Sequence, residues 1–482
     1  MKFKGVFHLI SYLLFFCGLA MGISGFVGWI AGDTLPDIFA LIGGGGVGVL
    51  SGAMLWVVTR GPVQLGRRDG FGVVTFGWLA VALVGMVPYL LAGVVHDPAS
   101  AFFETISGFT TTGASLLTDL ESLPRGLLFW RAMTQWLGGM GVLVLCVAIL
   151  PFLGVGGMQI YQAEMPGPGK DRLTPRIAST AKLLWGIYVL LTAVQVVLLV
   201  VGRMSVYDAV CHAFTTMSTG GFSTRSASIA AFDSAYIDWV VIVFMFLAGA
   251  NFSLHYRALR GEWRVFYRNP EFRFYFAAIV LGVLFTGLSL ARTGVVQGDD
   301  IVRHSAFQVL SILTTTGYAT RDFNLWPLAV RFLLVLFMFS GGCGGSTSGG
   351  IKMVRVFVLC KHVLRDLRRA MMPQAVSRIK LGRTVLEESA IANIVSFFVL
   401  FMTLFAIMTL IMSRYTPDLV TATSSVVACL GNVGPGLGAV GPTEVYAFIP
   451  APGKMVLSLA MLLGRLELYT VVLLLMPSFW RK

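Results

Sequence analysis

The stretch Thr314-Thr315-Thr316-Gly317-Tyr318 has three counterparts elsewhere in the chain. They are Thr111-Thr112-Gly113-Ala114, Thr219-Gly220-Gly221-Phe222 and Asn432-Val433-Gly434-Pro435. Their four glycines are 108, 96 and 117 residues apart, and each follows a run too short to cross a bilayer. Each run begins with a helix-starting residue 16 or 17 positions before its glycine, namely Asp97, Ser205, Asp300 or Asp418. The sequence therefore predicts a fourfold repeat of a half-crossing that ends in extended, glycine-containing backbone.

This repeated unit favours ion permeation. A dehydrated cation requires replacement oxygen ligands, and rings of backbone carbonyls supply them. Glycine permits the left-handed backbone that turns such carbonyls toward one axis. Non-helical backbone is tolerated at membrane depth only where protein buries it or where it lines a wet cavity. Re-entrant loops of a secondary transporter, or chance glycine-rich loops, are the alternatives, and the constant position of the glycine argues against them. The predicted ion-binding filter comprises Thr111, Thr112, Gly113, Thr219, Gly220, Gly221, Thr315, Thr316, Gly317, Asn432, Val433 and Gly434.

Composition places the chain in a membrane. Of its 482 residues 56% are hydrophobic and only 12% are charged, and the mean hydropathy is +0.81. The net charge of +13 sits in short loops between apolar runs, which indicates anchoring at the cytoplasmic face rather than binding of nucleic acid. The six cysteines and six histidines show neither metal-ligand spacing nor a disulfide framework. The first apolar run is too long for a cleavable signal peptide and is predicted to be a true crossing.

Apolar runs divide the chain into two leading crossings and four repeats. The leading crossings are expected at 6–31 and 35–59, within residues 1–70. The repeats occupy 71–178, 179–272, 273–385 and 386–482. The outer crossings of the four repeats are expected at 71–94, 180–202, 273–292 and 387–413. The pore helices are expected at 98–109, 206–217, 300–313 and 417–430, and the inner crossings at 126–151, 236–256, 326–359 and 452–477. The predicted fold class is an all-α polytopic membrane protein with two N-terminal transmembrane helices and four membrane–pore-loop–membrane repeats around a pseudo-fourfold pore.

Basic residues predict the orientation of these crossings. With both termini cytoplasmic, the inside segments hold 25 of the 36 lysines and arginines, and all four pore loops fall outside. Acidic residues near the pore loops are expected to concentrate cations at the outer mouth, although each alone fits an ordinary helix cap. They are Asp97, Asp208, Asp299, Asp300, Asp322 and Asp418. Arg225 and Arg321 each follow a filter glycine by four residues and are predicted to brace the loops through carboxylates.

Two glycine patterns match the dinucleotide-binding fingerprint without its context. Gly43-x-Gly45-x-x-Gly48 lies within a crossing, and Gly436-x-Gly438-x-x-Gly441 follows a filter, whereas the fingerprint requires a strand before it and a helix after it. Close helix packing through Gly44-x-x-x-Gly48 is the expected role of the first. No nucleotide site is predicted on this chain. No His/Asp/Ser or metal cluster supports the alternative of a membrane enzyme.

The third inner crossing contains six glycines within residues 340–350. Each costs about 1 kcal/mol relative to alanine in a helix interior, so the helix is expected to break beneath the filter. A glycine-rich packing face is the alternative. The fourth inner crossing carries Arg465 and Glu467, and a charge at mid-crossing is a functional candidate. Because a spacing of two residues suits a helical pair poorly, the two side chains are expected to have separate partners.

Four membrane–pore-loop–membrane units with degenerating Thr-Thr-Gly-Tyr-like filters resemble the Trk/Ktr/HKT superfamily, and within it the TrkH-like membrane subunits of bacterial Trk-type potassium uptake systems. The resemblance covers nearly the whole chain. It implies a potassium ion in the filter and no covalently bound cofactor, and the glycine at 113 favours potassium over sodium. It implies a gating loop of Gly341, Gly342, Gly344, Gly345, Gly349 and Gly350, with Arg465 lining the pore beside it.

The resemblance also implies partners and a location. A homodimer in the bacterial inner membrane, with one pore per chain and a cytosolic nucleotide-binding ring protein as regulator, is expected. The basic segments 257–273 and 352–383, with Arg365, Arg368 and Arg369, are expected to dock that regulator, and anchoring to anionic lipid is the alternative. A coupled symporter that moves potassium with protons or sodium also remains open, although the repeats read as parallel and few acids lie within crossings.

Overall fold

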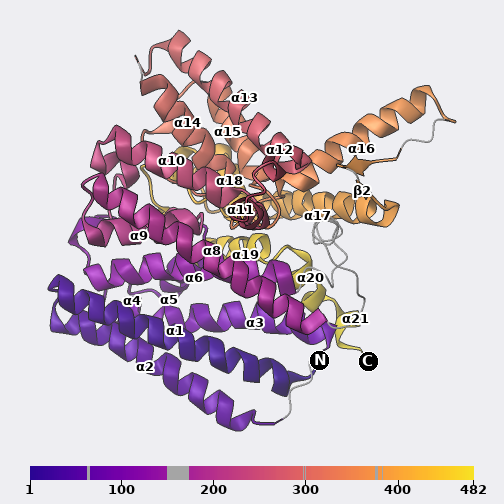
Figure 1. The fold of residues 1–482 in the computed structure, drawn as a ribbon. Helices are drawn as coiled ribbons and strands as arrows, with labels where there is room; N and C mark the ends of the chain where they lie inside the picture. Colours follow the sequence, from indigo (N-terminus) through magenta and orange to yellow (C-terminus); the bar gives the residue numbers. More distant parts are fainter. Residues whose placement is uncertain are drawn as a thin grey trace.

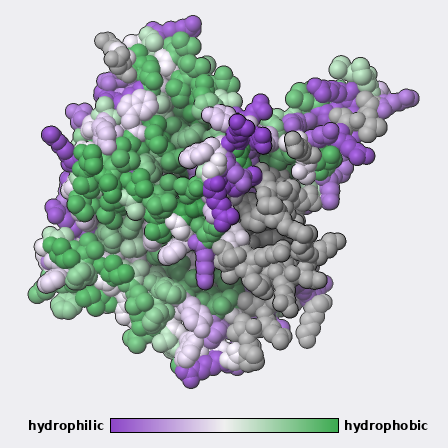
Figure 2. Space-filling view, in the orientation of Figure 1, coloured by the Kyte–Doolittle hydropathy of each residue, from purple (hydrophilic) through white to green (hydrophobic). Residues whose placement is uncertain are grey.

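The computed structural model describes residues 1–61, 66–148, 173–296, 298, 300–374, 378–382 and 384–481. This part of the chain is helical apart from one short antiparallel hairpin, β1 (Lys380–Leu381) with β2 (Thr384–Val385). Figure 1 shows α1 to α3 running lengthwise along the bundle, with both termini at the end from which α16 (Met353–Met371) projects. Hydrophobic residues cover most of the visible bundle surface in Figure 2, and hydrophilic residues gather on the projecting α16. This distribution suits a bundle surrounded by lipid.

Helices α1 (Phe3–Ala31) and α2 (Leu35–Val58) form the leading pair and pack through glycines. A Cβ atom added to Gly45 would lie 2.8 Å from the Gly18 carbonyl oxygen, and one added to Gly48 would lie 2.9 Å from Gly18 Cα. The predicted packing role of Gly48 is therefore confirmed, since only glycine lets the two backbones approach so closely. Gly44 faces elsewhere, against the Pro88 ring of α4 (Val87–Leu91).

Four units of outer helix, pore helix and inner helix follow the leading pair. The first comprises α3 (Arg67–Gly85), α4, α5 (Pro98–Phe109) and α6 (Arg125–Ala148), and the second α8 (Leu173–Val201), α9 (Val206–Met217), α10 (Ala235–Gly249) and α11 (Phe252–Leu259), with α12 (Val265–Arg268) after it. The third comprises α13 (Pro270–Thr293), α14 (Asp300–Leu313), α15 (Leu328–Ser340) and α16, and the fourth α17 (Glu388–Met412), α18 (Leu419–Leu430), α19 (Ala451–Arg465) and α20 (Tyr469–Leu475), with α21 (Pro477–Trp480) at the end. Short 3-10 turns lie at Leu120–Ser122, Ser228–Phe232, Phe323–Leu325, Gly438–Val440 and Tyr446–Phe448.

The predicted inner crossings 236–256 and 452–477 are not continuous helices. The α10–α11 pair bends by 102° and the α19–α20 pair by 118°. At the first break, the extended backbone of Ala250 ends one helix, and Asn251 caps the next by accepting a hydrogen bond from the Ser253 amide. At the second, Glu467 and Leu468 have left-handed backbone, with φ of +62° and +42°. The third inner crossing breaks between α15 and α16, as its glycines predict.

These breaks lower the number of uninterrupted spans in the described part of the chain. Six helices are long and apolar enough to cross a bilayer, and the two bent pairs raise the number to eight, against the ten crossings predicted. The break after Ser340 leaves α15 only 13 residues long. The end of the first predicted inner crossing, 149–151, lies outside the described residues.

Candidate ion pathway

The four pore helices begin and end close to the predicted residues. α5, α9 and α14 match 98–109, 206–217 and 300–313, and α18 begins two residues after the predicted 417. Side-chain oxygens of Asp97, Ser205 and Asp418 accept amide hydrogen bonds in the first turns of their helices, so local capping decides where these helices start. Asp300 is instead the first residue of α14 and pairs with Arg303.

The four predicted filter segments meet in one closed ring through their glycines. A Cβ atom added to any of the four filter glycines would lie within 2.5 Å of a carbonyl oxygen in the next repeat. The contacts are Gly113 with Gly220 O, Gly221 with Thr316 O, Gly317 with Val433 O and Gly434 with Thr112 O. The fourth contact returns to the first repeat. The four strands of extended backbone therefore surround a common axis in the order of the sequence.

In each of these segments, two residues that are two positions apart have a positive, left-handed φ. All four glycines have left-handed φ, between +76° and +99°, and so do the residues two positions before them: Thr111, Thr219, Thr315 and Asn432, with φ between +51° and +60°. Left-handed backbone is common for asparagine but unusual for a β-branched threonine, and each such residue costs on the order of 1–3 kcal/mol. Strain of this kind persists only where the surrounding structure imposes it. Its recurrence at one register position in four repeats makes these segments a candidate functional feature.

The backbone N–H groups of the predicted filter residues donate hydrogen bonds to carbonyls in the last turns of the pore helices. Thr111 and Thr112 donate to the carbonyls of Gly108 and Ser107 in the last turn of α5. The same pattern recurs for Thr219 and Gly220, for Thr315 and Thr316, and for Asn432 and Val433. With the N–H groups bound to the pore helices, the filter carbonyls are available to face the axis.

A buried loop lies directly beneath this ring. It runs from Gly341 to Lys352, and residues 346–348 are at most 1% exposed. The Gly349 amide donates to the Thr315 hydroxyl at 2.7 Å, and the Thr347 hydroxyl donates to the Met217 carbonyl at the end of α9 at 3.0 Å. The predicted break and its place below the filter are thus confirmed.

Arg465 ties the loop to the other two repeats. One guanidinium nitrogen donates to the Thr347 carbonyl at 2.6 Å, and another donates to the Gly138 carbonyl of α6 at 3.4 Å. The loop, itself part of repeat three, therefore contacts repeat two directly and repeats four and one through Arg465. The loop is therefore held, directly or through Arg465, by all four repeats that surround the axis.

Glu467 has a different partner, as the two-residue spacing predicts. Its carboxylate forms an ion pair with Arg355 of α16 at 2.5 Å, and the Arg355 guanidinium also lies over the Phe397 ring at 4.0 Å. Glu467 thus joins the kink of α19–α20 to the helix that leaves the loop.

Comparison with known proteins agrees with this geometry. Residues 42–482 match the family model TrkH, described as a cation transport protein. The chain belongs to the TrkH family. It is 39% identical to the Trk system potassium uptake protein TrkH of Halomonas elongata and 40% identical to that of Escherichia coli K12, and each comparison covers all of both chains. The crystal structure of the potassium transporter TrkH from Vibrio parahaemolyticus superimposes with a TM-score of 0.92 at 36% identity, again over all of both chains.

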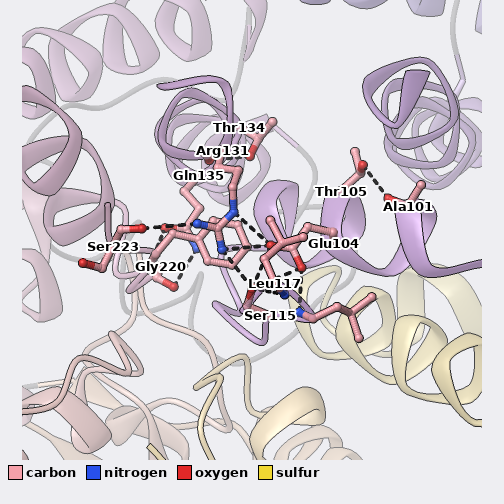
Figure 3. Close-up of polar contacts among 12 residues, drawn as sticks. Ala101, Glu104, Thr105, Ser115, Leu117, Arg131, Thr134, Gln135, Gly220 and Ser223 are labelled. Atoms are coloured by element: carbon pink, nitrogen blue, oxygen red, sulfur yellow. Dashed lines mark hydrogen bonds and ion pairs between the residues drawn. The ribbon is translucent and has the colours of Figure 1, made fainter. Parts of the chain in front are cut away.

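A buried ion pair that the sequence interpretation missed supports the filter of this TrkH-family chain. Arg131 of α6 and Glu104 of α5 lie 2.8 Å apart, with side chains 2% and 0% exposed. Figure 3 shows the Arg131 guanidinium between Glu104 and Ser223, to whose carbonyl it donates at 3.2 Å. Arg131 also stacks on the Phe222 ring at 4.0 Å. The pair therefore couples the pore helix of repeat one to the filter of repeat two.

Neighbouring polar groups complete this support. The Glu104 carboxylate accepts from the Leu116 amide, and the Gln135 amide donates to Gly220 O and accepts from the Phe222 amide. A charge within a predicted crossing is the signal that singles out Arg465 in 452–477, and the same reasoning applied to Arg131 in 126–151 would have found this pair.

Removing Arg131 alone should destabilise the protein strongly. Arg131→Met leaves the Glu104 carboxylate buried without its cation, at a cost of about 3–5 kcal/mol. Thermal unfolding of the detergent-solubilised chain measures this loss. The double variant Glu104→Gln/Arg131→Met should recover part of it, and Arg257→Met in the exposed Arg257–Glu262 pair should cost only about 0–1 kcal/mol. Equal losses for Arg131→Met and Arg257→Met would contradict the structural role.

Among the described residues, only one of the two predicted arginine braces has a carboxylate partner. Arg225 pairs with Asp208 at 3.2 Å, as predicted. Arg321 instead donates to the His304 ring at 3.5 Å, and no ion pair of Arg321 occurs among the described residues. Asp299 lies outside them.

Hydrogen bonds from Ser100 and from the Thr421 amide hold the pKa of Asp97 and of Asp418 below the ordinary value, so both helix-capping carboxylates are ionised at neutral pH.

The three candidate docking arginines lie on α16, away from the filter. Arg368 and Arg369 are exposed, but Arg365 is only 5% exposed. Its guanidinium pairs with Glu388 of α17 at 2.6 Å and contacts Asp366. The structure therefore does not place Arg365 on an open surface, because it fastens α16 to α17.

Proposed function

We propose that this chain takes up potassium across the inner membrane through a channel-like pore. The closed ring of filter glycines and neighbouring carbonyls is the observation that carries the proposal, because such a ring replaces the hydration shell of a dehydrated cation. The relatives named as Trk system potassium uptake proteins and potassium transporter TrkH support the choice of ion. The binding residues are the twelve filter residues, with potassium as the bound and transported ion. No enzymatic step is involved.

The Thr111 hydroxyl adds to this support. It is buried, and it has no hydrogen-bond partner among the described residues. It stands at the ring position where the equivalent Thr315 hydroxyl accepts from the gating loop. A buried hydroxyl without a protein partner is satisfied by an ion or by water in the pathway.

Ion flux into liposomes tests the proposal. Purified chain in liposomes should admit rubidium, a potassium substitute, down its gradient, and excess external potassium should compete with rubidium more strongly than excess sodium does. Liposomes without protein are the control. Equal competition by the two ions would contradict potassium selectivity.

Gating is proposed to reside in the glycine loop and Arg465, under control of a cytosolic ring protein that binds nucleotide. The contacts of the loop with all four repeats support a closed pathway in the chain alone.

The projection of α16 beyond the bundle offers a docking surface for the ring protein (Figure 1). Large exposed apolar side chains on α16, among them Leu364, Leu367 and Met371, support its burial against a second copy in a homodimer.

Reversing two charges on α16 should weaken docking of the regulator. Arg368→Glu/Arg369→Glu removes two cations from the exposed part of α16 and adds two like charges against an acidic partner surface, so retention of the ring protein in a pull-down should fall at least tenfold. Arg365→Glu is unsuitable because it also breaks the contact with Glu388. Arg203→Glu/Arg292→Glu carries the same change of net charge in the turn after α8 and in the last turn of α13, and it should leave retention unchanged. Unchanged retention by the α16 variant would exclude this helix as the docking site.

A further inference from the structure

A surface pocket of about 720 Å³ lies where α13 begins. Its walls come from two places in the sequence, the segment around α12 and the β1–β2 hairpin. The lining residues that carry charge are Arg257, Glu262, Arg264, Arg268 and Glu271. The hairpin closes the other side through Leu381, Gly382 and Thr384. None of the predicted filter residues and neither of the exposed arginines of α16 lines this pocket.

The positive charge in this pocket is only partly compensated. Arg257 is paired with Glu262 at 2.7 Å. Arg264 and Arg268 are exposed, and within the described part of the chain neither forms an ion pair. Two guanidinium groups without carboxylate partners beside a concave surface are suited to a phosphate, which they bind through paired N–H donors.

The position of the pocket favours a lipid phosphate over a soluble one. α13 is one of the spans, so Pro270 in the pocket wall lies at the edge of the hydrocarbon layer. Trp263 and Tyr267 are 64% and 81% exposed beside the arginines. Exposed tryptophan and tyrosine at the end of a span are typical of the headgroup level of a bilayer. Basic pockets at such a level bind anionic lipid headgroups.

We propose that this pocket binds the headgroup of an anionic phospholipid, with Arg264 and Arg268 on the phosphate. The far wall of the pocket is Glu271, which is 4% exposed. One Glu271 carboxylate oxygen accepts from the Gly344 amide at 2.6 Å and from the Val354 amide at 3.1 Å. These amides lie within the glycine loop and at the start of α16. Lipid binding therefore stabilises the position of Glu271 and, through it, the loop; this consequence rests on the proposed gate, whereas the lipid site does not.

Native mass spectrometry of the full-length chain tests the lipid site. The chain should retain phosphatidylglycerol at least tenfold more strongly than phosphatidylcholine, and Arg264→Gln/Arg268→Gln should abolish this difference. The matched control, Arg368→Gln/Arg369→Gln on α16, should behave like the unmodified chain. Equal retention by the pocket variant and the control would overturn the proposal. Displacement of the lipid by millimolar glycerol 3-phosphate would also overturn it, since the site would then bind soluble phosphate.

Hydrogen–deuterium exchange tests the connection with the loop independently of transport. Adding phosphatidylglycerol should slow exchange of peptides covering residues 341–354 in the unmodified chain but not in Arg264→Gln/Arg268→Gln. Lipid binding without a change in this exchange would overturn the coupling through Glu271. Loss of regulator binding in the pocket variant with lipid retention unchanged would show a protein interface and contradict the lipid assignment.

Discussion

Gly317→Ala is expected to lower the ratio of potassium to sodium flux at least tenfold while the chain still folds. The new Cβ would overlap the Val433 carbonyl and lie 2.8 Å from the Pro435 ring, at a φ of +80°. Left-handed backbone alone costs alanine about 1–2 kcal/mol, and the carbonyl of the next repeat has to move. Since that carbonyl belongs to the ring that replaces ion hydration, the loss should appear first in selectivity.

The other filter glycines should behave in the same way. Alanine or serine at position 113, 221 or 434 meets a carbonyl of the neighbouring repeat at a similarly positive φ. Gly186→Ala is the matched control, because that glycine lies in α8 with no atom within 4 Å of the added Cβ. Flux of each ion into liposomes gives the ratio. Wild-type selectivity in all four filter variants would show that the filter lies elsewhere.

Arg465→Ala is expected to raise basal cation flux several-fold in liposomes that contain this chain alone. The substitution removes a fixed positive charge from the pathway, where little water screens it from a passing cation. It also removes the donors that hold the Thr347 and Gly138 carbonyls, and so it frees the loop that we propose as the gate. Selectivity should persist, because the filter ring is intact above the loop.

Two further variants sharpen this test. Arg465→Lys keeps the charge but loses the fork of donors, so its flux should lie between those of the arginine and alanine proteins. Deleting Gly344 and Gly345 should also raise flux. Combining the deletion with Arg465→Ala should raise it by less than the sum of the two effects, since both changes remove the same barrier. Size-exclusion profiles establish that each variant is folded. Unchanged basal flux in folded Arg465→Ala would make the arginine a structural residue and place the gate elsewhere.

Features with a local cause were predictable from the sequence. The pore helices begin at side chains that cap their own first turns, and the third inner helix breaks at its run of glycines. The left-handed turn in each of the four segments was predictable because such a position selects glycine in every repeat. The break at Asn251 also had a local signal, since an asparagine after Gly249-Ala250 is a typical helix cap.

Features with a tertiary cause were not predictable. The kink at Glu467 and Leu468 contains neither glycine nor proline, and its carboxylate is held by Arg355, more than a hundred residues earlier in the chain. The burial of Arg365 likewise depends on Glu388 of a neighbouring helix. In both cases a charged partner far away in the sequence holds the residue. The hydrophobic periodicity of one segment does not indicate which distant residue will be that partner.

The reversal potential of the purified chain in a planar bilayer tests the central claim most directly. A tenfold potassium gradient is imposed first at equal pH and equal sodium, and then with opposed proton and sodium gradients. Arg465→Ala protein is measured in parallel so that the basal current is large. A channel-like pore with a potassium filter predicts a reversal potential close to the potassium equilibrium value that does not move with the proton gradient and moves with the sodium gradient only through residual sodium permeability. A shift of that potential with the proton gradient, or a shift with the sodium gradient larger than sodium permeation through the same pore produces, would contradict the account and indicate a coupled symporter.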